Sequence, residues 1–510
     1  MHEIYYYMKE GNSIASVRVY GLERVFRQFL DMEPTSMLIR GLPGTGKTTL
    51  ALELINMMHE KYNCFYISTR VSFAKLQRYY PWIIGLINDN SLQSYSDANN
   101  AAIDLRLGSA SGTMELVLDI ITNKKKALIV LDSWDSLVNY AKKEERIKME
   151  KTMVTVADTH DALLIFVSEE PELNTTSYFV DGIVTLSMEQ YHSTRIRKMS
   201  IDKMRGVAVN NYTYLYTLLN ARFTILPTLC DYRNFTDIDI NRGYSGSYAG
   251  IDNAYTDFRE EEMSNSNRKG QDAYTMIPTW SIDLDNLLGG GFKNGSSILL
   301  EVDPLIDESI LLSMLTKMIL RNNINDYNKC IIVSDTSERP LGRVVRYVKN
   351  GYYNYVDRIN NNDNNNYDNI NNNSNNNIML LTDKERLFKS SINPNTLTFD
   401  TDTFFNRYEE IMLKYKRPAL MILDHSIIDR YELSKVASII NVIKDDGNVI
   451  VIIADTTLNN SSTTKSLTDM HMKLLLLENV PLLHITKPSL GLFGVAYSNN
   501  GPSYSLIKVV

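Results

Sequence analysis

Cysteine is scarce in this sequence. The 510 residues include three cysteines, Cys64, Cys230 and Cys330, which lie far apart and form no C-x-x-C pair. An odd number of widely spaced cysteines supplies neither a disulfide framework nor the ligands of a structural zinc site. This cysteine usage indicates a reducing compartment, so we expect a cytoplasmic protein.

Long apolar runs and strong charge are missing as well. No stretch approaches the 18 or more apolar residues of a membrane-spanning helix, and the first residues lack the pattern of a secretory signal. The net charge is −7 and the isoelectric point is about 5.7. We therefore expect no membrane partner, and a nucleic-acid partner would need a local basic patch.

A glycine-rich segment follows an apolar run at 37–39. It reads Gly41-Leu42-Pro43-Gly44-Thr45-Gly46-Lys47-Thr48, fits G-x-x-x-x-G-K-[ST] at every position, and leads into a helix-favouring pattern. Glycines allow consecutive backbone N–H groups to close around phosphate oxygens at a positively polarised helix N-terminus. The segment therefore predicts a P-loop.

The P-loop in turn predicts the contacts with the nucleotide. We expect Lys47 to reach the β- and γ-phosphates of ATP and the Thr48 hydroxyl to bind Mg²⁺. The predicted cofactor-binding residues are Gly41, Leu42, Pro43, Gly44, Thr45, Gly46, Lys47, Thr48 and Thr49.

Three further apolar runs, at 63–68, 126–133 and 162–168, are bounded by turn residues and separated by helix-favouring segments. This alternation predicts an α/β fold with a doubly wound, mostly parallel sheet that binds ligands at the carboxyl ends of its strands. Asp132 falls at the end of the run at 126–133, so we expect it to hold Mg²⁺ beside Thr48 as the Walker B acid. The alternative is an aspartate that merely begins a turn.

Several runs together resemble the KaiC-type branch of the RecA superfamily. They are 39–51, 66–69, 178–186 and Lys203-Met204-Arg205-Gly206, which matches the K-M-R-G motif of that branch. Within the branch, residues 68–71 and 167–172 resemble the gas-vesicle regulatory protein D group of archaeal ATPases more than the clock protein itself. The resemblance covers about residues 20–227 and implies a RecA-like ATP-binding domain there.

The residues that hydrolysis needs follow the family pattern less closely. KaiC-like ATPases carry a glutamate pair after the second strand, similar to S-T-E-E, whereas this chain has Ser68-Thr69-Arg70-Val71. Arginine cannot act as a base, and contact with phosphate is the alternative role for Arg70. Glu169 is our candidate for positioning the attacking water, with Glu170 and Asp135 as substitutes. A solvated loop charge is the alternative explanation for each.

The K-M-R-G motif supplies two more catalytic candidates. By the resemblance, Lys203 and Arg205 reach the γ-phosphate on a neighbouring subunit and act in trans. The residues alone leave two alternatives. The basic segment 195–205 is the solvated face of an edge strand, or it forms a nucleic-acid surface with the tyrosines of 212–216.

An altered copy of the same fold follows. The run 280–292 resembles the opening of a second KaiC-like domain. Apolar strands then recur at 297–302, 329–334, 419–424 and 448–455. This order predicts a second RecA-like sheet in tandem with the first.

The nucleotide site of this second copy is expected to be degenerate. Residues 301–309 stand where a P-loop should lie, but they contain no glycine and no lysine. Their carboxylates, from Glu301, Asp303, Asp307 and Glu308, would repel a triphosphate. The tail offers Thr486-Lys487-Pro488-Ser489 in place of K-M-R-G.

Two polar segments set the expected domain limits. Residues 228–275 are rich in turn formers and predict a flexible linker. The segment 360–377 has 13 asparagines in 18 positions and cannot bury enough apolar surface to offset its chain entropy. We therefore expect a KaiC/RecA-like ATP-binding domain at 1–227 and a degenerate KaiC/RecA-like domain at 276–510 that carries this insertion.

These observations favour a nucleotide-switched regulatory ATPase, slow and active in the first domain only. A trans role for Lys203 and Arg205 implies a homo-oligomer with head-to-tail contacts. The second domain is expected to serve structure or to bind a partner, for which a regulatory protein is the candidate. Two alternatives stay open, namely a DNA-binding recombination-mediator ATPase and an ATP-binding interaction protein without turnover.

Overall fold

The computed structural model describes most of two separate regions of the chain. The first is residues 22–229, without 34, 89–91, 94–109, 140, 171–174, 192–193 and 210. The second is residues 276–307 without 280, then 329–333, 378–381, 419–425, 433–456, 461–497 and 504–510, with isolated residues in 310–318 and 405–413. The asparagine-rich insertion and the predicted linker, apart from 228 and 229, lie outside the described residues.

The described residues divide into two compact units. The first unit holds residues 22–226 and 508–510, and the second holds residues 227–507. Among the described residues, no helix is long and apolar enough to cross a membrane. The expectation of a cytoplasmic protein stays a prediction.

The first unit alternates strands and helices, as the sequence predicts. Its described elements are α1 (Leu22–Asp31), β1 (Ser36–Gly41), α2 (Lys47–Met58), β2 (Asn63–Ser68), α3 (Phe73–Tyr79), α4 (Ile83–Asn88), β3 (Leu92–Gln93), α5 (Ala110–Asn123), β4 (Ala127–Asp132), α6 (Trp134–Val138), α7 (Lys143–Thr159), β5 (Leu163–Ser168), η1 (Thr175–Tyr178), β6 (Gly182–Tyr191), β7 (Thr194–Met204), β8 (Thr213–Thr217), η2 (Leu219–Ala221) and β9 (Thr224–Ile225). They form one sheet in the order β3-β2-β4-β5-β1-β6-β7-β8-β9.

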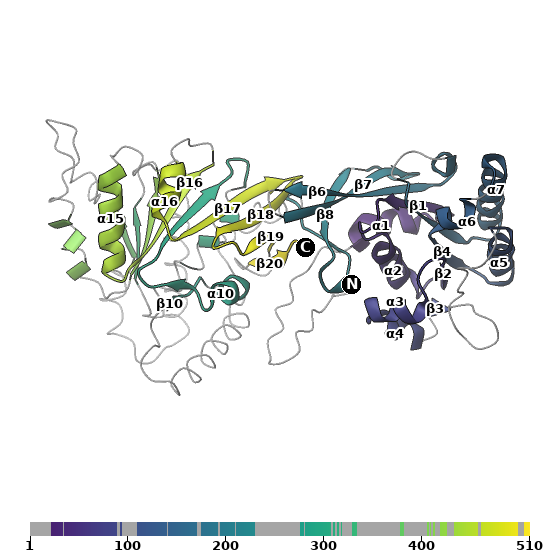
Figure 1. Cartoon of the computed structure of the whole chain (residues 1–510), viewed down its shortest axis with the longest axis horizontal. Coiled ribbons are helices and arrows are strands. Elements are labelled where there is room, and N and C mark those ends of the chain that lie inside the picture. The colour runs from purple at the N-terminus through teal and green to yellow at the C-terminus, as the bar shows by residue number, and fades with distance from the viewer. Residues whose placement is uncertain are drawn as a thin grey trace, which may run out of the picture. The chain divides into compact units, whose positions relative to one another are not determined.

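This sheet is parallel from β3 to β6 and antiparallel from β6 to β9. The central strands β1 and β5 are buried at every position, because helices cover both faces of the sheet. Along β1 the side chains alternate between the two faces, so Ile39 packs with α1 to α4 and Leu38 with α5 to α7 (Figure 1). A strand buried on both faces reads as a continuous apolar run, which is why the sequence located it.

The second unit repeats this topology. Its described elements are β10 (Met276–Ile277), α10 (Ile282–Leu288), β11 (Phe292–Lys293), β12 (Ser297–Val302), β13 (Lys329–Val333), β14 (Ile378–Leu381), β15 (Ala419–Asp424), α15 (Leu433–Asp445), β16 (Val449–Asp455), α16 (Ser461–Leu467), β17 (Met470–Leu477), β18 (Val480–Lys487), β19 (Gly491–Tyr497) and β20 (Tyr504–Lys508). The order β14-β13-β15-β16-β12-β17-β18-β19-β20 matches the first sheet strand for strand.

The repeat extends to single hydrogen bonds. In the first unit Asp181 Oδ2 accepts from Ser36 Oγ at 3.1 Å, which ties the start of β1 to the residue before β6. In the second unit Asp469 Oδ2 accepts from Ser297 Oγ at 2.9 Å, at the same places on β12 and β17. We call this pair of contacts the Ser–Asp brace. The predicted fold class, two tandem RecA-like, mostly parallel sheets, is confirmed.

Candidate functional site

The P-loop connects β1 to α2 at the carboxyl end of the sheet. Gly41 has a φ of 149°, and a Cβ on it would lie 2.2 Å from the carbonyl oxygen of Leu186 on β6. Gly46, at the N-cap of α2, has a φ of 93° and offers no side-chain cap. Only glycine tolerates both positions, so the two outer glycines of the motif are required by the backbone itself.

Residues far along the chain hold this loop in place. The Tyr216 hydroxyl on β8 donates to the Thr45 carbonyl, and Tyr216 stacks on Phe223 with ring centroids 4.1 Å apart. The Leu218 side chain lies 2.9 Å from where a Cβ of Gly46 would be. The sequence analysis missed this support, because nothing local links β8 to a loop some 170 residues earlier.

The first turn of α2 presents free backbone donors. Within the part of the chain that the structure describes, the N–H groups of Lys47, Thr48 and Thr49 have no protein acceptor, and the first bond back to the loop runs from Leu50 to Gly46 at 2.9 Å. Free N–H groups at a helix N-terminus attract anions. The loop geometry therefore fits a phosphate group.

Lys47 lies inside the loop. Its Nζ donates to the carbonyl oxygens of Gly41 at 2.7 Å and Leu42 at 3.0 Å. Burial lowers the pKa of Lys47, and this effect outweighs the opposite effects of Glu169 and Asp132. The ammonium group is thus held by weak neutral acceptors, in a position to bind a stronger, anionic one.

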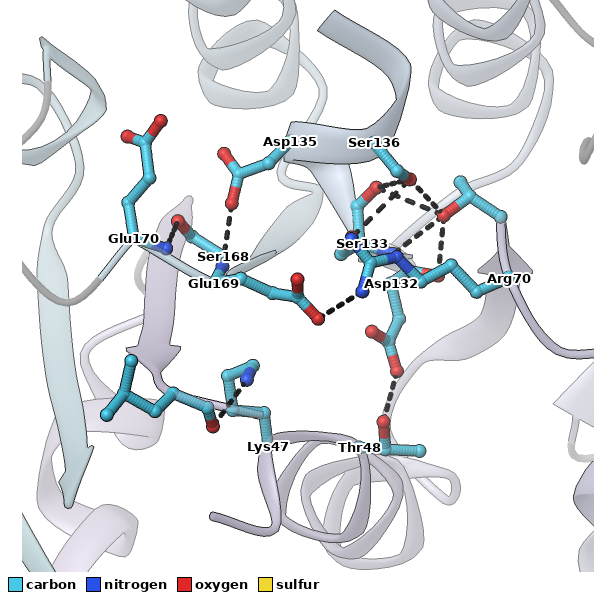
Figure 2. Close-up of polar contacts among 12 residues, drawn as sticks. Lys47, Thr48, Arg70, Asp132, Ser133, Asp135, Ser136, Ser168, Glu169 and Glu170 are labelled. Carbon is cyan, nitrogen blue, oxygen red and sulfur yellow. Dashed lines mark hydrogen bonds and ion pairs between the residues drawn. The ribbon is translucent and has the colours of Figure 1, made fainter. Parts of the chain in front are cut away.

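Thr48 and Asp132 meet as the sequence predicts for a metal pair. Thr48 Oγ1 donates to Asp132 Oδ2 at 2.6 Å (Figure 2), and the buried Tyr66 hydroxyl on β2 donates to the same oxygen at 2.6 Å. Burial, together with the Asp132 charge, raises the pKa of Tyr66 well above its usual value, so the phenol stays a donor. A hydroxyl and a carboxylate oxygen are ligands that Mg²⁺ prefers. Tyr66, which orients the carboxylate, was not predicted.

Glu169 and Arg70 face each other above the P-loop (Figure 2). The Arg70 guanidinium donates to Glu169 Oε1, joining the loop after β2 to the loop after β5. The Arg70 side chain is 47% exposed and that of Glu169 28%. The candidate base is therefore engaged by Arg70.

The two substitute carboxylates, Asp135 and Glu170, have structural partners. Asp135 Oδ1 accepts from Arg146 at 3.1 Å, and its Oδ2 accepts the Glu169 N–H at 2.7 Å. Arg146 also lies 3.6 Å from Glu170 and donates to the fully buried Glu150 at 2.9 Å. Asp135 therefore fixes the backbone of the Glu169 loop instead of facing solvent.

Lys203 and Arg205 do not lie beside the P-loop of their own chain. Met204 between them pairs with Gly182, which pairs with Met37, four residues before Gly41. This offset corresponds to about 13 Å along the strands. Lys203 Nζ donates to the Ser177 carbonyl at 3.2 Å, and Arg205 lies 3.0 Å from Asp181 while its side chain remains 56% exposed.

Two of the three tyrosines of the alternative nucleic-acid surface pack inside the protein and are not available to stack on bases. Tyr216 is buried beneath the P-loop, and Tyr214 packs against the core, whereas Tyr212 is 67% exposed. Lys198 in the same region forms an ion pair with Glu189 at 2.9 Å. In addition, β8 pairs with β7 over 197–200, so that part of β7 is not a sheet edge.

The matching region of the second unit differs. Asp303 closes a short turn by accepting the Leu305 N–H at 2.9 Å, and no described residue of this loop is glycine. The expectation that Glu301 would face a triphosphate is wrong. Its side chain is buried and lies 2.9 Å from Lys465, 2.8 Å from His471 and 3.2 Å from Lys473. The alternation of side chains along β12 directs Glu301 toward these residues instead of toward the loop. Glu308 lies outside the described residues.

The fold and the site together define a RecA-like P-loop domain, a class that binds a nucleotide with a divalent metal ion. The family model described as GvpD gas vesicle protein, P-loop domain, matches residues 26–202. Residues 26–202 are therefore similar to the GvpD P-loop domain.

Two curated relatives are similar to the chain, both from Halobacterium salinarum (strain NRC-1). Protein GvpD1 is 24% identical over 298 residues, which are 56% of this chain and 51% of the relative. Protein GvpD2 is 24% identical over 291 residues, 55% of this chain and 54% of the relative. The chain spans about half the length of the curated relatives that it matches.

Proposed function

We propose that this protein is a nucleotide-switched regulatory ATPase of the KaiC-like branch, whose first unit binds ATP with Mg²⁺. The observation that supports this most is the P-loop itself, with free N–H groups at the start of α2, the Lys47 ammonium inside the loop, and the Thr48–Asp132 contact of 2.6 Å. Backbone donors, a cation and a metal-binding pair lie together there, and these are the groups that bind a nucleoside triphosphate.

In this proposal each residue has one task. Lys47 exchanges its loop carbonyls for the β- and γ-phosphate oxygens, and Thr48 and Asp132 hold Mg²⁺ while Tyr66 orients the aspartate. When bound, Mg²⁺ neutralises charge on the phosphates. Glu169 positions the attacking water, and turnover is slow because its carboxylate must first leave Arg70, since a carboxylate bound to a guanidinium is a poor acceptor for a second donor.

We further propose that Lys203 and Arg205 act on the nucleotide of a neighbouring copy. They lie about four residues along the strands from Gly41, and the Arg205 side chain is exposed. Both observations favour a role on the nucleotide of a neighbouring chain over a role on that of the same chain. Contacts of this kind run head to tail and build a ring or filament. Bound nucleotide would then stabilise the assembly by mass action.

The second unit, with proposed limits 276–510, serves structure or binds a regulatory protein in this proposal. Its topology matches the first unit, but its loop after β12 lacks the glycines and lysine of a P-loop. Because the matching family is described as a gas vesicle protein, proteins of gas vesicle formation are the first partners to test. The two other candidates, a DNA-binding ATPase and a binding protein without turnover, are distinguished by DNA-stimulated turnover and by absent phosphate release.

The test is light scattering at micromolar protein with and without a non-hydrolysable ATP analogue and Mg²⁺. We expect the analogue to increase the mean particle mass of wild type. Arg205→Ala should bind the analogue with an unchanged affinity, but its particle mass should not increase. Lys47→Ala should lose both binding and assembly, because it removes the phosphate-bridging ammonium.

Lys148→Ala, which removes an exposed charge from α7, is the control and should assemble as wild type does. Wild type that binds the analogue yet stays monomeric, or Arg205→Ala that assembles equally well, would contradict the trans proposal. A solvated basic strand would then explain these residues.

A further inference from the structure

We propose that Arg70 and Glu169 form a γ-phosphate latch. Before nucleotide arrives, the Arg70 guanidinium binds the Glu169 carboxylate. When ATP is bound, the guanidinium moves to the γ-phosphate, and Glu169 is released to position water. This inference rests on the proposed ATP-binding function and names the residue by which that site distinguishes ATP from ADP.

The placement of the two side chains supports the latch. Arg70 follows β2 and Glu169 follows β5, and both strands border β4, which carries Asp132. The two loops therefore meet over the P-loop at the carboxyl end of the sheet, where Figure 2 shows the side chains pointing toward each other above Lys47 and Thr48. Glu169 raises and Arg70 lowers the pKa of Lys47, so both charges act on the ammonium at the centre of the loop.

The support around the pair is uneven. The Glu169 backbone is fixed, since its N–H donates to Asp135 at 2.7 Å and Asp135 is itself held by Arg146 at 3.1 Å. The Glu169 side chain has one described partner, which is Arg70. A rigid backbone with a singly held side chain allows the carboxylate to be released without moving the loop.

The pair itself is easy to exchange. Ion pairs between partly exposed side chains contribute little to stability, because water and salt screen them. A phosphate oxygen is a better partner for a guanidinium, which binds phosphate through two parallel hydrogen bonds. The γ-phosphate would therefore compete successfully with Glu169, whereas ADP has no group that competes.

The chemistry of the two positions also fits together. Arg70 and Glu169 carry opposite charges and stand opposite each other in two loops. Arg70 therefore holds the Glu169 carboxylate, which has no other described partner, until another anion draws the guanidinium away. The latch thus keeps the site inactive until a triphosphate is bound.

The test compares the affinities for ADP and for a non-hydrolysable ATP analogue, both with Mg²⁺, by titration calorimetry on the full chain. The informative variant is the neutral double substitution Arg70→Gln/Glu169→Gln, which removes both charges and retains an amide pair. We expect its preference for the analogue over ADP to fall about tenfold below that of wild type, with the affinity for ADP unchanged.

The single substitution Glu169→Gln removes the competitor and should raise the preference for the analogue. Glu144→Gln, which removes an exposed carboxylate from the first turn of α7, is the control and should leave the preference unchanged. Retained binding of ADP shows that each variant is folded, and Arg70→Ala/Glu169→Ala repeats the test without the amide pair.

The outcomes separate the latch from the function on which it rests. A preference of either double variant within about threefold of wild type would mean that the pair persists in the bound state, and the latch would be overturned. Wild type that binds neither nucleotide would instead refute the proposed function.

Discussion

The two nine-stranded sheets differ most where their central strands end. In the first unit, the buried Arg40 donates to Thr185 at 2.7 Å and to Asp202 at 2.7 Å, and Gly41 follows it. In the second unit, the matching residue is Glu301, surrounded by cations, and Val302 follows it. One scaffold thus accepts a buried charge of either sign, provided that neighbouring strands supply the opposite one.

The features that both units retain show which contacts serve the fold. The Ser–Asp brace is present in each unit. In each unit the strand that follows the aspartate, β6 or β17, also has a register shift after its second residue. Lys203 pairs with the second residue of β6 and Lys487 with the second residue of β17, and each lysine donates to a carbonyl before the brace. The lysine of the K-M-R-G motif therefore has a structural role that the second unit preserves.

The arginine of that motif separates the two units instead. Counting from the paired lysines, Arg205 corresponds to Ser489 in the second unit. The second unit lacks both the P-loop and this arginine, which agrees with the proposed role of Arg205 at the nucleotide.

The largest effect should come from adding one methyl group at the end of β1. Gly41→Ala would place a Cβ 2.2 Å from the Leu186 carbonyl, so we expect a loss of about 2–4 kcal/mol from the first unit and no nucleotide binding. Val302→Ala, at the matching place in the second unit, should cost about 1 kcal/mol. Thermal unfolding with and without ADP measures the stability loss of each variant and its nucleotide binding. Equal stability losses in the two variants would contradict the claim that the two strand ends are constrained differently.

A smaller effect should come from the brace of the second unit. Burial alone would raise the pKa of Asp469, but hydrogen bonds from Lys444 and from Ser297, together with the Lys444 charge, lower it overall. A lowered folded-state pKa stabilises the protein above the unfolded value, near 3.8, and this stability is lost as the pH falls through the folded value.

Asp469→Asn should therefore destabilise the second unit by at most about 1 kcal/mol at pH 7, because Asp469 is half exposed, and by less at pH 3. Urea unfolding at the two pH values gives this difference. Asp445→Asn, an exposed aspartate in the last turn of α15, is the control and should show no such change. A difference that grows toward low pH would have the wrong sign for this account.

Sequence patterns located the parts of the fold that depend on local order. The P-loop, Asp132 and the central strands β1, β2, β4 and β5, with their counterparts β12, β13, β15 and β16, follow from apolar runs, turn residues and glycine spacing. The contacts that complete the site do not, because register brings them together from distant places. Tyr66 reaches Asp132 across 66 residues, and Tyr216 reaches Thr45 across 171. The partners of Glu301 were missed for the same reason, since they come from α16 and β17.

The central claim is that the first unit binds nucleotide at its P-loop and the second unit does not. Its most direct test is the stoichiometry of a non-hydrolysable ATP analogue, with Mg²⁺, per full chain by titration calorimetry. We predict one site in wild type, one in Lys293→Ala, which removes an exposed lysine of the second unit, and affinity reduced by at least about 100-fold in Lys47→Ala. Two sites per wild-type chain, or unchanged binding by Lys47→Ala, would contradict the account.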